Sequence, residues 1–309
     1  MTKHLLLAVD GGATKTSLSL RTTTGNVLFE KISTGSNYQA IGETRACEVL
    51  TGLLHAAAPY CEGPIDAAVF AIAGIDTPKD QTVVTAIVEK SVATAGLQIR
   101  QLLIENDVEA TLLGATAGQP GSLLIAGTGA IAYAFTGTSI VRCGGWGHRA
   151  GDEGSGYWIG QQMLKVIFRH ADGRSEQPTQ LTALVLQKLG LTSVDELLNW
   201  LYAPNYTNAQ VAGLGSLLAE AVAAQDIVAC HIAQKAAEEL VLLASAILHK
   251  TGYTSGPYTF YLNGGVLEYN DCITDAFYQQ MRSHYPDIEW RMCIDKPIEY
   301  IVKRAIAVL

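Results

Sequence analysis

The sequence predicts an α/β protein of two domains, each built on the same order of elements: three strands, helix, strand, helix, strand and helix. A chain of 309 residues is too long for one ordinary hydrophobic core. Its composition, 49% hydrophobic and 16% charged, supplies enough apolar surface for two cores. The predicted order of elements in residues 1–117 begins again near residue 118, without a low-complexity linker. Two such units facing one another leave an interdomain cleft, where small ligands are commonly held.

The first copy opens with three short strand candidates separated by Gly-Gly and Thr-Gly-Asn turns, and an alanine-rich apolar run marks a later buried strand. Asp107 is placed to cap the helix that ends this copy. The predicted elements are strands 4–10, 16–22 and 26–33, helix 40–57, strand 67–73, helix 79–95, strand 100–105 and helix 107–117.

The second copy repeats the glycine turn after its first strand and carries helical insertions. Apolar spacing predicts helix 157–170 and a longer helix, 228–250, with one apolar face. The other predicted elements are strands 123–129, 130–136, 139–143, 258–262 and 287–292, and helices 270–283 and 298–309. We expect the final helix to join the first domain, so that the domains comprise 1–117 with 298–309, and 118–297.

Charge and composition argue against several classes of function. The net charge is -8 and basic residues form no cluster larger than a pair, which argues against nucleic-acid binding. The apolar run near the N-terminus, Leu5–Val9, is too short for a signal peptide, and no stretch reaches the ~18 apolar residues of a membrane span. The six cysteines are dispersed and predict reduced thiols in a cytoplasmic protein.

The first motif with chemical meaning is D-G-G-A-T-K-T, residues 10–16, at the end of the opening strand. Glycines leave backbone N–H groups bare, as phosphate binding requires, and a carboxylate beside them can hold Mg²⁺ through water. An ordinary hairpin turn is the alternative. The string matches neither the P-loop nor the Rossmann fingerprint. The second copy echoes it with A-G-T-G-A, residues 126–130, which suggests two loops closing on one polyphosphate.

Two further motifs carry carboxylates. The first is G-G-W-G-H-R-A-G-D-E-G-S-G-Y-W-I-G, residues 144–160. Its glycines and tryptophans, with Asp152 and Glu153, favour a sugar pocket. The carboxylates could accept hydrogen bonds from sugar hydroxyls, and the tryptophans offer flat surface for the C–H face of the sugar. Either carboxylate could instead cap the following helix. Glu105-Asn106-Asp107 follows a strand, where ligands of parallel sheets bind, so Asp107 could accept the proton of an attacking hydroxyl or merely cap its helix.

The order of these motifs along the chain, together with the turns G-S-N at 35–37 and N-G-G at 263–265, resembles that of the N-acetylglucosamine kinase family. This family is one of the BadF/BadG-type ATPases of the actin–hexokinase–Hsp70 superfamily. The resemblance covers nearly the whole chain and implies two actin-like, ribonuclease H-like domains. It implies a cytoplasmic kinase that uses ATP and Mg²⁺ to phosphorylate the 6-hydroxyl of an amino sugar, and a homodimer is the ordinary expectation. One departure is Arg304-Ala305, where the family has Gly-Ala opening the final helix; this puts the packing of that helix in doubt.

The resemblance also implies roles for individual residues. Asp107 is the base that faces the 6-hydroxyl, Asp10 lies near Mg²⁺, and Cys143 lies near the sugar without a chemical role. The implied sugar contacts are Asn37, Asp107, Gly145, Trp146 and Asp152. The implied ATP contacts are Gly11, Gly12, Thr14, Lys15 and Thr16 in the first loop, Gly127, Thr128 and Gly129 in the second, and Gly264 and Gly265 at the adenosine.

Several alternatives stay open. N-acetylglucosamine, N-acetylmuramic acid and glucosamine are all possible substrates, and the Gly-Asp-Glu-Gly-Ser string favours the N-acetylated sugars. A second possible function is that of an ATPase activator, which couples ATP hydrolysis to a partner protein. Such proteins hold an iron–sulfur cluster through paired cysteines. The closest pair of cysteines here, Cys47 and Cys61, lacks a glycine-rich loop for a cluster. A third is a non-catalytic sugar sensor, although no helix-turn-helix segment precedes residue 4.

Overall fold

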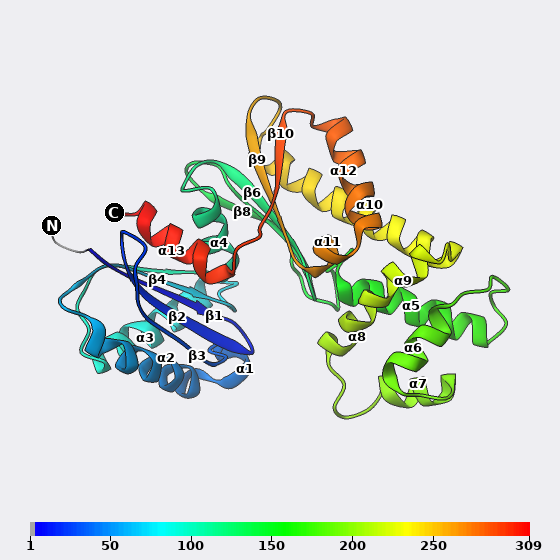
Figure 1. The fold of residues 1–309 in the computed structure, drawn as a ribbon, viewed down its shortest axis with the longest axis horizontal. Coiled ribbons are helices and arrows are strands. Elements are labelled where there is room, and N and C mark those ends of the chain that lie inside the picture. Colours follow the sequence, from blue (N-terminus) through cyan, green and yellow to red (C-terminus); the bar gives the residue numbers. More distant parts are fainter. Residues whose placement is uncertain (1–3) are drawn as a thin grey trace. The chain divides into compact units, whose positions relative to one another are not determined.

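The computed structural model describes residues 4–309, which divide into two compact units (Figure 1). The first unit comprises the described residues up to Pro120 together with Ile294–Leu309, and the second unit is Gly121–Cys293. The sequence placed the corresponding boundaries at 117/118 and 297/298. Each unit contains one five-stranded mixed sheet with helices packed on it.

The sheet of the first unit has the order β3-β2-β1-β4-β5, formed by β1 (Leu5–Gly11), β2 (Lys15–Thr22), β3 (Val27–Thr34), β4 (Ile65–Ile72) and β5 (Ile99–Glu105). The first three strands pair antiparallel, whereas β1, β4 and β5 run parallel. Every residue of β4 is buried, as expected for an inner strand covered on both faces.

Helices cover both faces of this sheet: α1 (Tyr38–Ile41), α2 (Glu43–Ala57), α3 (Pro78–Thr94), α4 (Asp107–Ala115) and α13 (Pro297–Ala307), with a 3-10 turn at Ala58–Tyr60. Side chains alternate along β1, so that Leu5 and Leu7 join the core with α2 and α3, while Leu6 and Ala8 join the core with α4 and α13. Helices α4 and α13 pack closely at Gly114, where an added Cβ would lie 1.9 Å from the carbonyl oxygen of Tyr300.

The sheet of the second unit has the order β10-β9-β6-β7-β8, formed by β6 (Gly121–Ala126), β7 (Ala130–Phe135), β8 (Ile140–Gly144), β9 (Tyr258–Asn263) and β10 (Ile288–Met292). One hydrophobic core joins this sheet to its helices. These are α5 (Gly156–Ala171), α6 (Leu181–Leu189), α7 (Val194–Leu201), α8 (Asn208–Leu214), α9 (Leu218–Ala223), α10 (Ile227–Thr251), α11 (Gly265–Tyr269) and α12 (Asp271–His284), with a 3-10 turn at Gly215–Leu217.

The two sheets share one topology. Strands β6 to β10 take the places of β1 to β5 in the same order, with antiparallel pairs among the first three strands and parallel pairs to the last two. The predicted fold class, two α/β units each opening with three strands, is therefore confirmed. The segment between α5 and α10, which the sequence indicated only as helical insertions, contains four separate short helices.

Two local predictions differ from the structure. The predicted helix 40–57 is split at Gly42, whose φ of 81° ends α1 before α2 begins. The Arg304-Ala305 pair does not open the final helix, because α13 begins at Pro297. Ala305 is fully buried in the core shared with β1, so the helix packs despite the departure.

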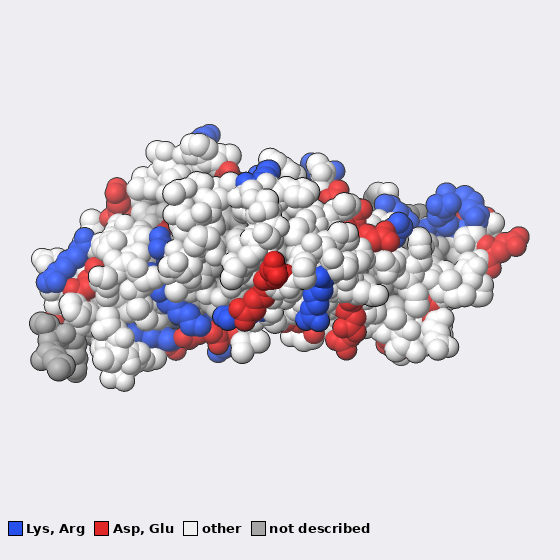
Figure 2. Space-filling model, turned by 90° about the horizontal axis from the view of Figure 1, so that it is seen from above, with Lys and Arg blue, Asp and Glu red and all other residues white. Residues whose placement is uncertain are grey.

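Acidic and basic side chains are interspersed on the face shown in Figure 2. No helix within residues 4–309 has the length and apolar character needed to cross a bilayer.

Candidate functional site

The first glycine turn lies between β1 and β2 and is closed by a hydrogen bond from Gly12 N to the carbonyl oxygen of Lys15 (2.9 Å). Gly11 has no room for a side chain, because an added Cβ would lie 2.4 Å from Ser36 Oγ. Thr14 and Lys15 are exposed at the tip, whereas the Thr16 side chain is fully buried and its Oγ1 has no hydrogen-bond partner among the described residues. The turn therefore presents bare backbone together with the side chains of Thr14 and Lys15.

Carboxylates gather near this turn, at the carboxyl ends of the parallel strands. Asp10 is the last residue but one of β1, and Asp107 lies two residues after the end of β5. Burial, and then the negative charges of Asp10 and Asp76, raise the pKa of Asp107 to about 6. Burial also raises the pKa of Asp10, partly opposed by the charge of Lys15. The first unit thus holds a partly desolvated carboxylate of increased basicity beside the glycine turn.

Asp107 does not cap its helix, which corrects the sequence interpretation. The cap of α4 is Asn106, whose Oδ1 accepts from the backbone N–H groups of Val108 (2.9 Å) and Glu109 (3.4 Å). Asp107 is the first helical residue, and its Oδ1 accepts from Val108 N at 3.0 Å. The cap is therefore supplied without the Asp107 carboxylate.

Asn37, the first predicted sugar contact, also lies in the first unit, near the segment before Asp107. It caps α1 by accepting from Gln39 N at 2.9 Å. Its amide lies against Gly74, where an added Cβ would be 2.6 Å from Asn37 Oδ1. The neighbouring Ile75 accepts a hydrogen bond from Asn106 Nδ2 (3.3 Å). The structure thus brings Asn37 close to the segment that carries Asp107.

In the second unit, Asp152 lies on the second glycine turn. An added Cβ on Gly129 would be 2.9 Å from Asp152 Oδ2, so this carboxylate packs directly against the turn. Burial raises the pKa of Asp152, opposed by the backbone N–H groups of Ala130 and Gly147 that donate to it. The alternative of a helix cap at Asp152 or Glu153 is wrong, because Ser155 caps α5 by accepting from Trp158 N (3.2 Å).

Gly145 and Trp146 begin the loop that leads to Asp152. Gly145 has a φ of 67°, and an added Cβ would be 2.2 Å from Ile131 Cδ1. The next side chain, Trp146, is 70% exposed, and the Arg142 guanidinium lies 4.6 Å from its ring centroid. Trp146 therefore offers an exposed aromatic ring in the loop that leads to Asp152.

A cavity of about 400 Å³ joins the second glycine turn to the turn after β9. Gly264 packs on β6, since an added Cβ would be 2.4 Å from the Ala126 carbonyl oxygen. Gly129 is absent from the lining, which consists of Gly127, Thr128, Gly156, Ala209, Ala212, Gly213, Gly215, Ser216, Gly265, Val266, Tyr269 and Asn270. The sequence interpretation missed the wall formed by Ala209 to Ser216, Tyr269 and Asn270; the only signal was the G-L-G-S string at 213–216.

Glycines in α5 explain how the helical insertion reaches this cavity. An added Cβ on Gly156 would be 3.1 Å from the Gly127 carbonyl oxygen, and one on Gly160 would be 2.1 Å from the Val211 carbonyl oxygen. Gly156 N also donates to the Gly127 carbonyl (2.8 Å). Small residues therefore let α5, α8 and the glycine turn approach closely.

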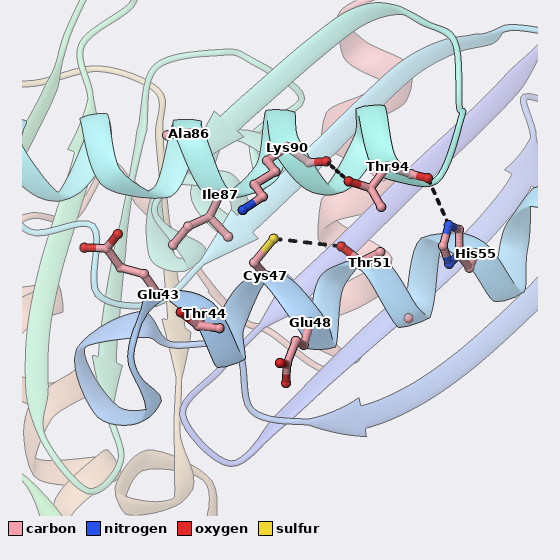
Figure 3. A pocket seen from close by; sticks show the side chains of 11 residues that line it. Glu43, Thr44, Cys47, Glu48, Thr51, His55, Ala86, Ile87, Lys90 and Thr94 are labelled. Carbon is pink, nitrogen blue, oxygen red and sulfur yellow. Dashed lines mark hydrogen bonds between the residues drawn. The ribbon is translucent and has the colours of Figure 1, made fainter.

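A larger hollow, about 610 Å³, lies between α2 and α3 (Figure 3). Its lining includes Cys47, His55 and Lys90 and contains none of the residues predicted to bind ligands. We therefore place the candidate site at the glycine turns and not in this groove.

Comparison with known proteins identifies the family. The family model of the BadF/BadG/BcrA/BcrD ATPase family matches residues 7–292. The chain belongs to this family. It is 29% identical to an N-acetylmuramic acid/N-acetylglucosamine kinase of Clostridium acetobutylicum, and the alignment covers 92% of this chain and 92% of the relative. It is also 29% identical to an N-acetyl-D-glucosamine kinase of Dictyostelium discoideum, covering 94% of this chain and 93% of the relative.

Solved structures support the fold of this family member. A crystal structure described as "Putative N-acetylglucosamine Kinase from Chromobacterium violaceum" has a TM-score of 0.74 and covers 99% of this chain and 100% of its own. At 24% identity this likeness concerns the fold alone.

Proposed function

We propose that this protein is an ATP-dependent amino-sugar kinase that phosphorylates the 6-hydroxyl of N-acetylglucosamine or a close relative. The observation that carries the proposal is Asp107, a carboxylate of raised pKa beside Asn37 and the first glycine turn. Two relatives that match over nearly their whole length are named as kinases of such sugars.

The nucleotide is assigned to the glycine turns and the cavity of the second unit. Backbone N–H groups of Gly11 and Gly12, with Thr14, Lys15 and Thr16, would stabilise charge on phosphoryl oxygens, as would Gly127, Thr128 and Gly129. The cavity beside Gly264 and Gly265, with the exposed ring of Tyr269 in its wall, suits the adenosine. Thr16 contributes its backbone and not its buried hydroxyl.

Among residues 4–309 no three His, Cys, Asp or Glu side chains are grouped as for a metal ion, so a magnesium ion here would depend on Asp10 together with water and the phosphate oxygens. Asp10, Asp76 and Asp107 lie close enough for the charges of the first two to raise the pKa of Asp107. Hard oxygen ligands of this kind, with water and phosphate oxygens completing the shell, are those that Mg²⁺ prefers. Bound there through Asp10, the ion would neutralise charge on the phosphates.

Asp107 is the proposed base. Its pKa of about 6 leaves it ionised at neutral pH yet more basic than an exposed aspartate, whose pKa is about 3.9. The sugar would be held by Asn37, Gly145 and Asp152 and would lie on the open face of Trp146. Transfer then consists mainly of positioning and charge stabilisation, with Asp107 accepting the hydroxyl proton.

The proposal includes a cytoplasmic homodimer, since ATP is available in the cytoplasm and symmetric dimers are the commonest assemblies. The activator alternative is not favoured, because both matched curated relatives are named as kinases.

The test is release of ADP from Mg·ATP, alone and with N-acetylglucosamine, N-acetylmuramic acid, glucosamine and, as a control, glucose. Strong stimulation by an N-acetylated sugar but not by glucose is the expected result. Release that ignores every sugar would support the activator instead, and no release with any sugar would favour a sensor.

A further inference from the structure

We propose that the hydrogen bond between His148 and Asn208 couples the two ligands, so that a bound sugar strengthens nucleotide binding and the reverse. The inference rests on the proposed function, which identifies the ligand of the 145–155 loop as the sugar and that of the cavity as the nucleotide. Both side chains belong to the second unit.

His148 lies in the loop between Trp146 and Asp152. Its Nδ1 is 2.9 Å from Nδ2 of Asn208, a residue 60 positions later in the chain. A charge on the imidazole would lower the pKa of the Asp152 carboxyl, which shows that these two side chains are close. His148 thus lies in the loop that carries Trp146 and Asp152, close to the Asp152 carboxylate.

Asn208 is the first residue of α8, and the same helix forms one wall of the cavity through Ala209, Ala212 and Gly213. A capping box between Thr207 and Gln210 fixes the start of this helix. Because α8 is short and held at its start, a shift at Asn208 moves the cavity wall with it.

Tyr157 provides a second connection between the same elements. Its backbone N–H donates to the carbonyl of Thr128 (3.2 Å), in the glycine turn. Its ring packs edge-on against His148, with centroids 5.1 Å apart. Its hydroxyl is 3.1 Å from that of Tyr206, just before α8. His148 is therefore positioned both by Asn208 and by the buried ring of Tyr157, which is hydrogen-bonded to the second glycine turn.

These contacts predict positive coupling between the ligands. A sugar that orders the loop fixes His148, and His148 then holds Asn208 and the cavity wall in the arrangement that accepts the nucleotide. Thermodynamic linkage requires the nucleotide to strengthen sugar binding by the same factor. One neutral hydrogen bond typically corresponds to about 2- to 12-fold in an equilibrium constant, which sets the size of effect that this bond can transmit.

The test is calorimetric measurement of the Kd of N-acetylglucosamine with and without the ATP analogue AMP-PNP and Mg²⁺. The ratio of the two Kd values is compared in the wild type, Asn208→Ala, His148→Ala and the double variant. Asn199→Ala, an exposed asparagine of α7, is the matched control. We expect the ratio to fall about 2- to 12-fold in each single variant, no further in the double variant, and not at all in the control.

The affinity of Asn208→Ala for AMP-PNP without sugar is the readout that separates coupling from a merely structural role. We expect it to change by less than about twofold, because the cavity lining is intact. An equal loss with and without sugar, an unchanged ratio, or a wild type without coupling would overturn the inference alone. A wild type that binds neither ligand would overturn the proposed function as well.

Discussion

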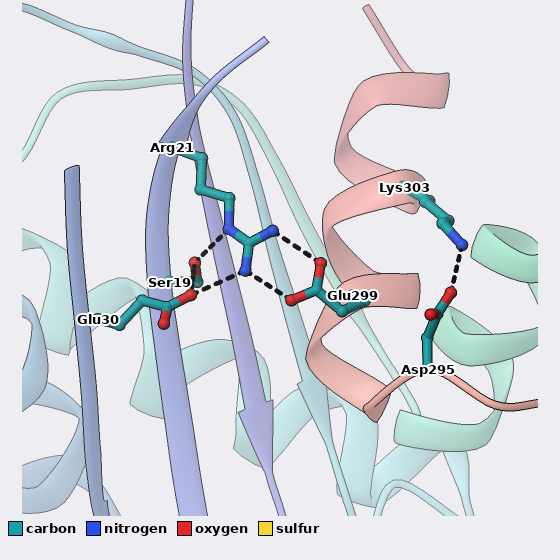
Figure 4. A network of polar contacts seen from close by, with 6 residues as sticks. All are labelled: Ser19, Arg21, Glu30, Asp295, Glu299 and Lys303. Atoms are coloured by element: carbon teal, nitrogen blue, oxygen red, sulfur yellow. Dashed lines mark hydrogen bonds and ion pairs between the residues drawn. The ribbon is translucent and has the colours of Figure 1, made fainter. Parts of the chain in front are cut away.

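Two ion pairs on the same helix allow burial to be tested as the source of ion-pair stability (Figure 4). Arg21 of β2 is 11% exposed and donates to both carboxylate oxygens of Glu299 on α13, at 2.6 and 2.7 Å. It also donates to Ser19 Oγ and Glu30 Oε1, each at 2.8 Å. Lys303 of α13 contacts Asp295 at a similar distance, 2.7 Å, but these side chains are 50% and 41% exposed. The shortest distances are thus similar, while the burial of the cation and the number of its hydrogen bonds differ.

Arg21→Ala should destabilise the first unit by about 2–3 kcal/mol. A hydrogen bond to a charged group contributes about 1.5–3 kcal/mol when desolvated, and the bidentate Glu299 contact is the largest part here. The contact to Glu30, 51% exposed, adds little, since an exposed pair contributes about 0–1 kcal/mol. By the same reasoning Lys303→Ala should cost at most about 1 kcal/mol, including its position 4.8 Å from the Tyr300 ring centroid.

The assay is urea unfolding followed by far-UV circular dichroism and, separately, by tryptophan fluorescence. All four tryptophans lie between residues 146 and 290, so their fluorescence reports on the second unit and serves as an internal control. With a slope of about 2 kcal/mol per molar urea, Arg21→Ala should lower the dichroism midpoint by about 1 M and Lys303→Ala by less than about 0.5 M. Equal shifts for the two variants would refute the reasoning.

Further outcomes are expected for changes at Asp107, Gly264 and Arg304. Asp107→Asn should lower kcat by about 10²–10⁴-fold. In the wild type, kcat/KM should rise with pH up to about 6 and then level, because the carboxylate must be ionised; a flat profile between pH 5 and 8 would contradict this. The folded-state pKa of Asp107 exceeds its unfolded value, so stability falls as pH rises from about 4 to about 6, and Asp107→Asn should unfold at higher urea than wild type at pH 7. Gly264→Ala places a Cβ 2.4 Å from the Ala126 carbonyl oxygen, at a residue whose φ is 105°. The substitution should therefore lower the free energy of unfolding by about 1–3 kcal/mol and weaken AMP-PNP binding. An unchanged affinity in calorimetry would contradict the assignment of this turn to the nucleotide. Arg304→Ala leaves the Glu105 carboxylate, which is 12% exposed, without its bidentate partner. The free energy of unfolding in urea should fall by about 3 kcal/mol. A double variant that also carries Glu105→Gln should recover part of this loss.

Much of the fold could be predicted because the signals are local. The apolar runs at β1 and β4 and the glycine turns after β1 and β6 each lie within a few residues of chain. Helix caps were harder, because several neighbouring residues are chemically suitable. The capping residues are Asn106 and Ser155. Asp107 is the first helical residue and accepts from the Val108 N–H group, and Asp152 lies outside its helix.

The helical insertion could not be assigned to the site from sequence. Ala209, Ala212 and Gly213 carry no chemical group that marks a ligand, and they line the cavity only because Gly156 and Gly160 let α8 approach α5. Tyr269 was likewise an ordinary residue until α11 placed it beside the same cavity.

The sequence by itself determined the duplicated unit, its strands and the places where backbone is bare, since hydrophobic period and glycine content are properties of neighbouring residues. Only the tertiary structure decided which groups share an environment. Asp10 and Asp76 raise the pKa of Asp107, Asn208 meets His148 across 60 residues, and Arg304 meets Glu105 across 199. Burial and charge act through space, so these relations exist only once the chain is folded.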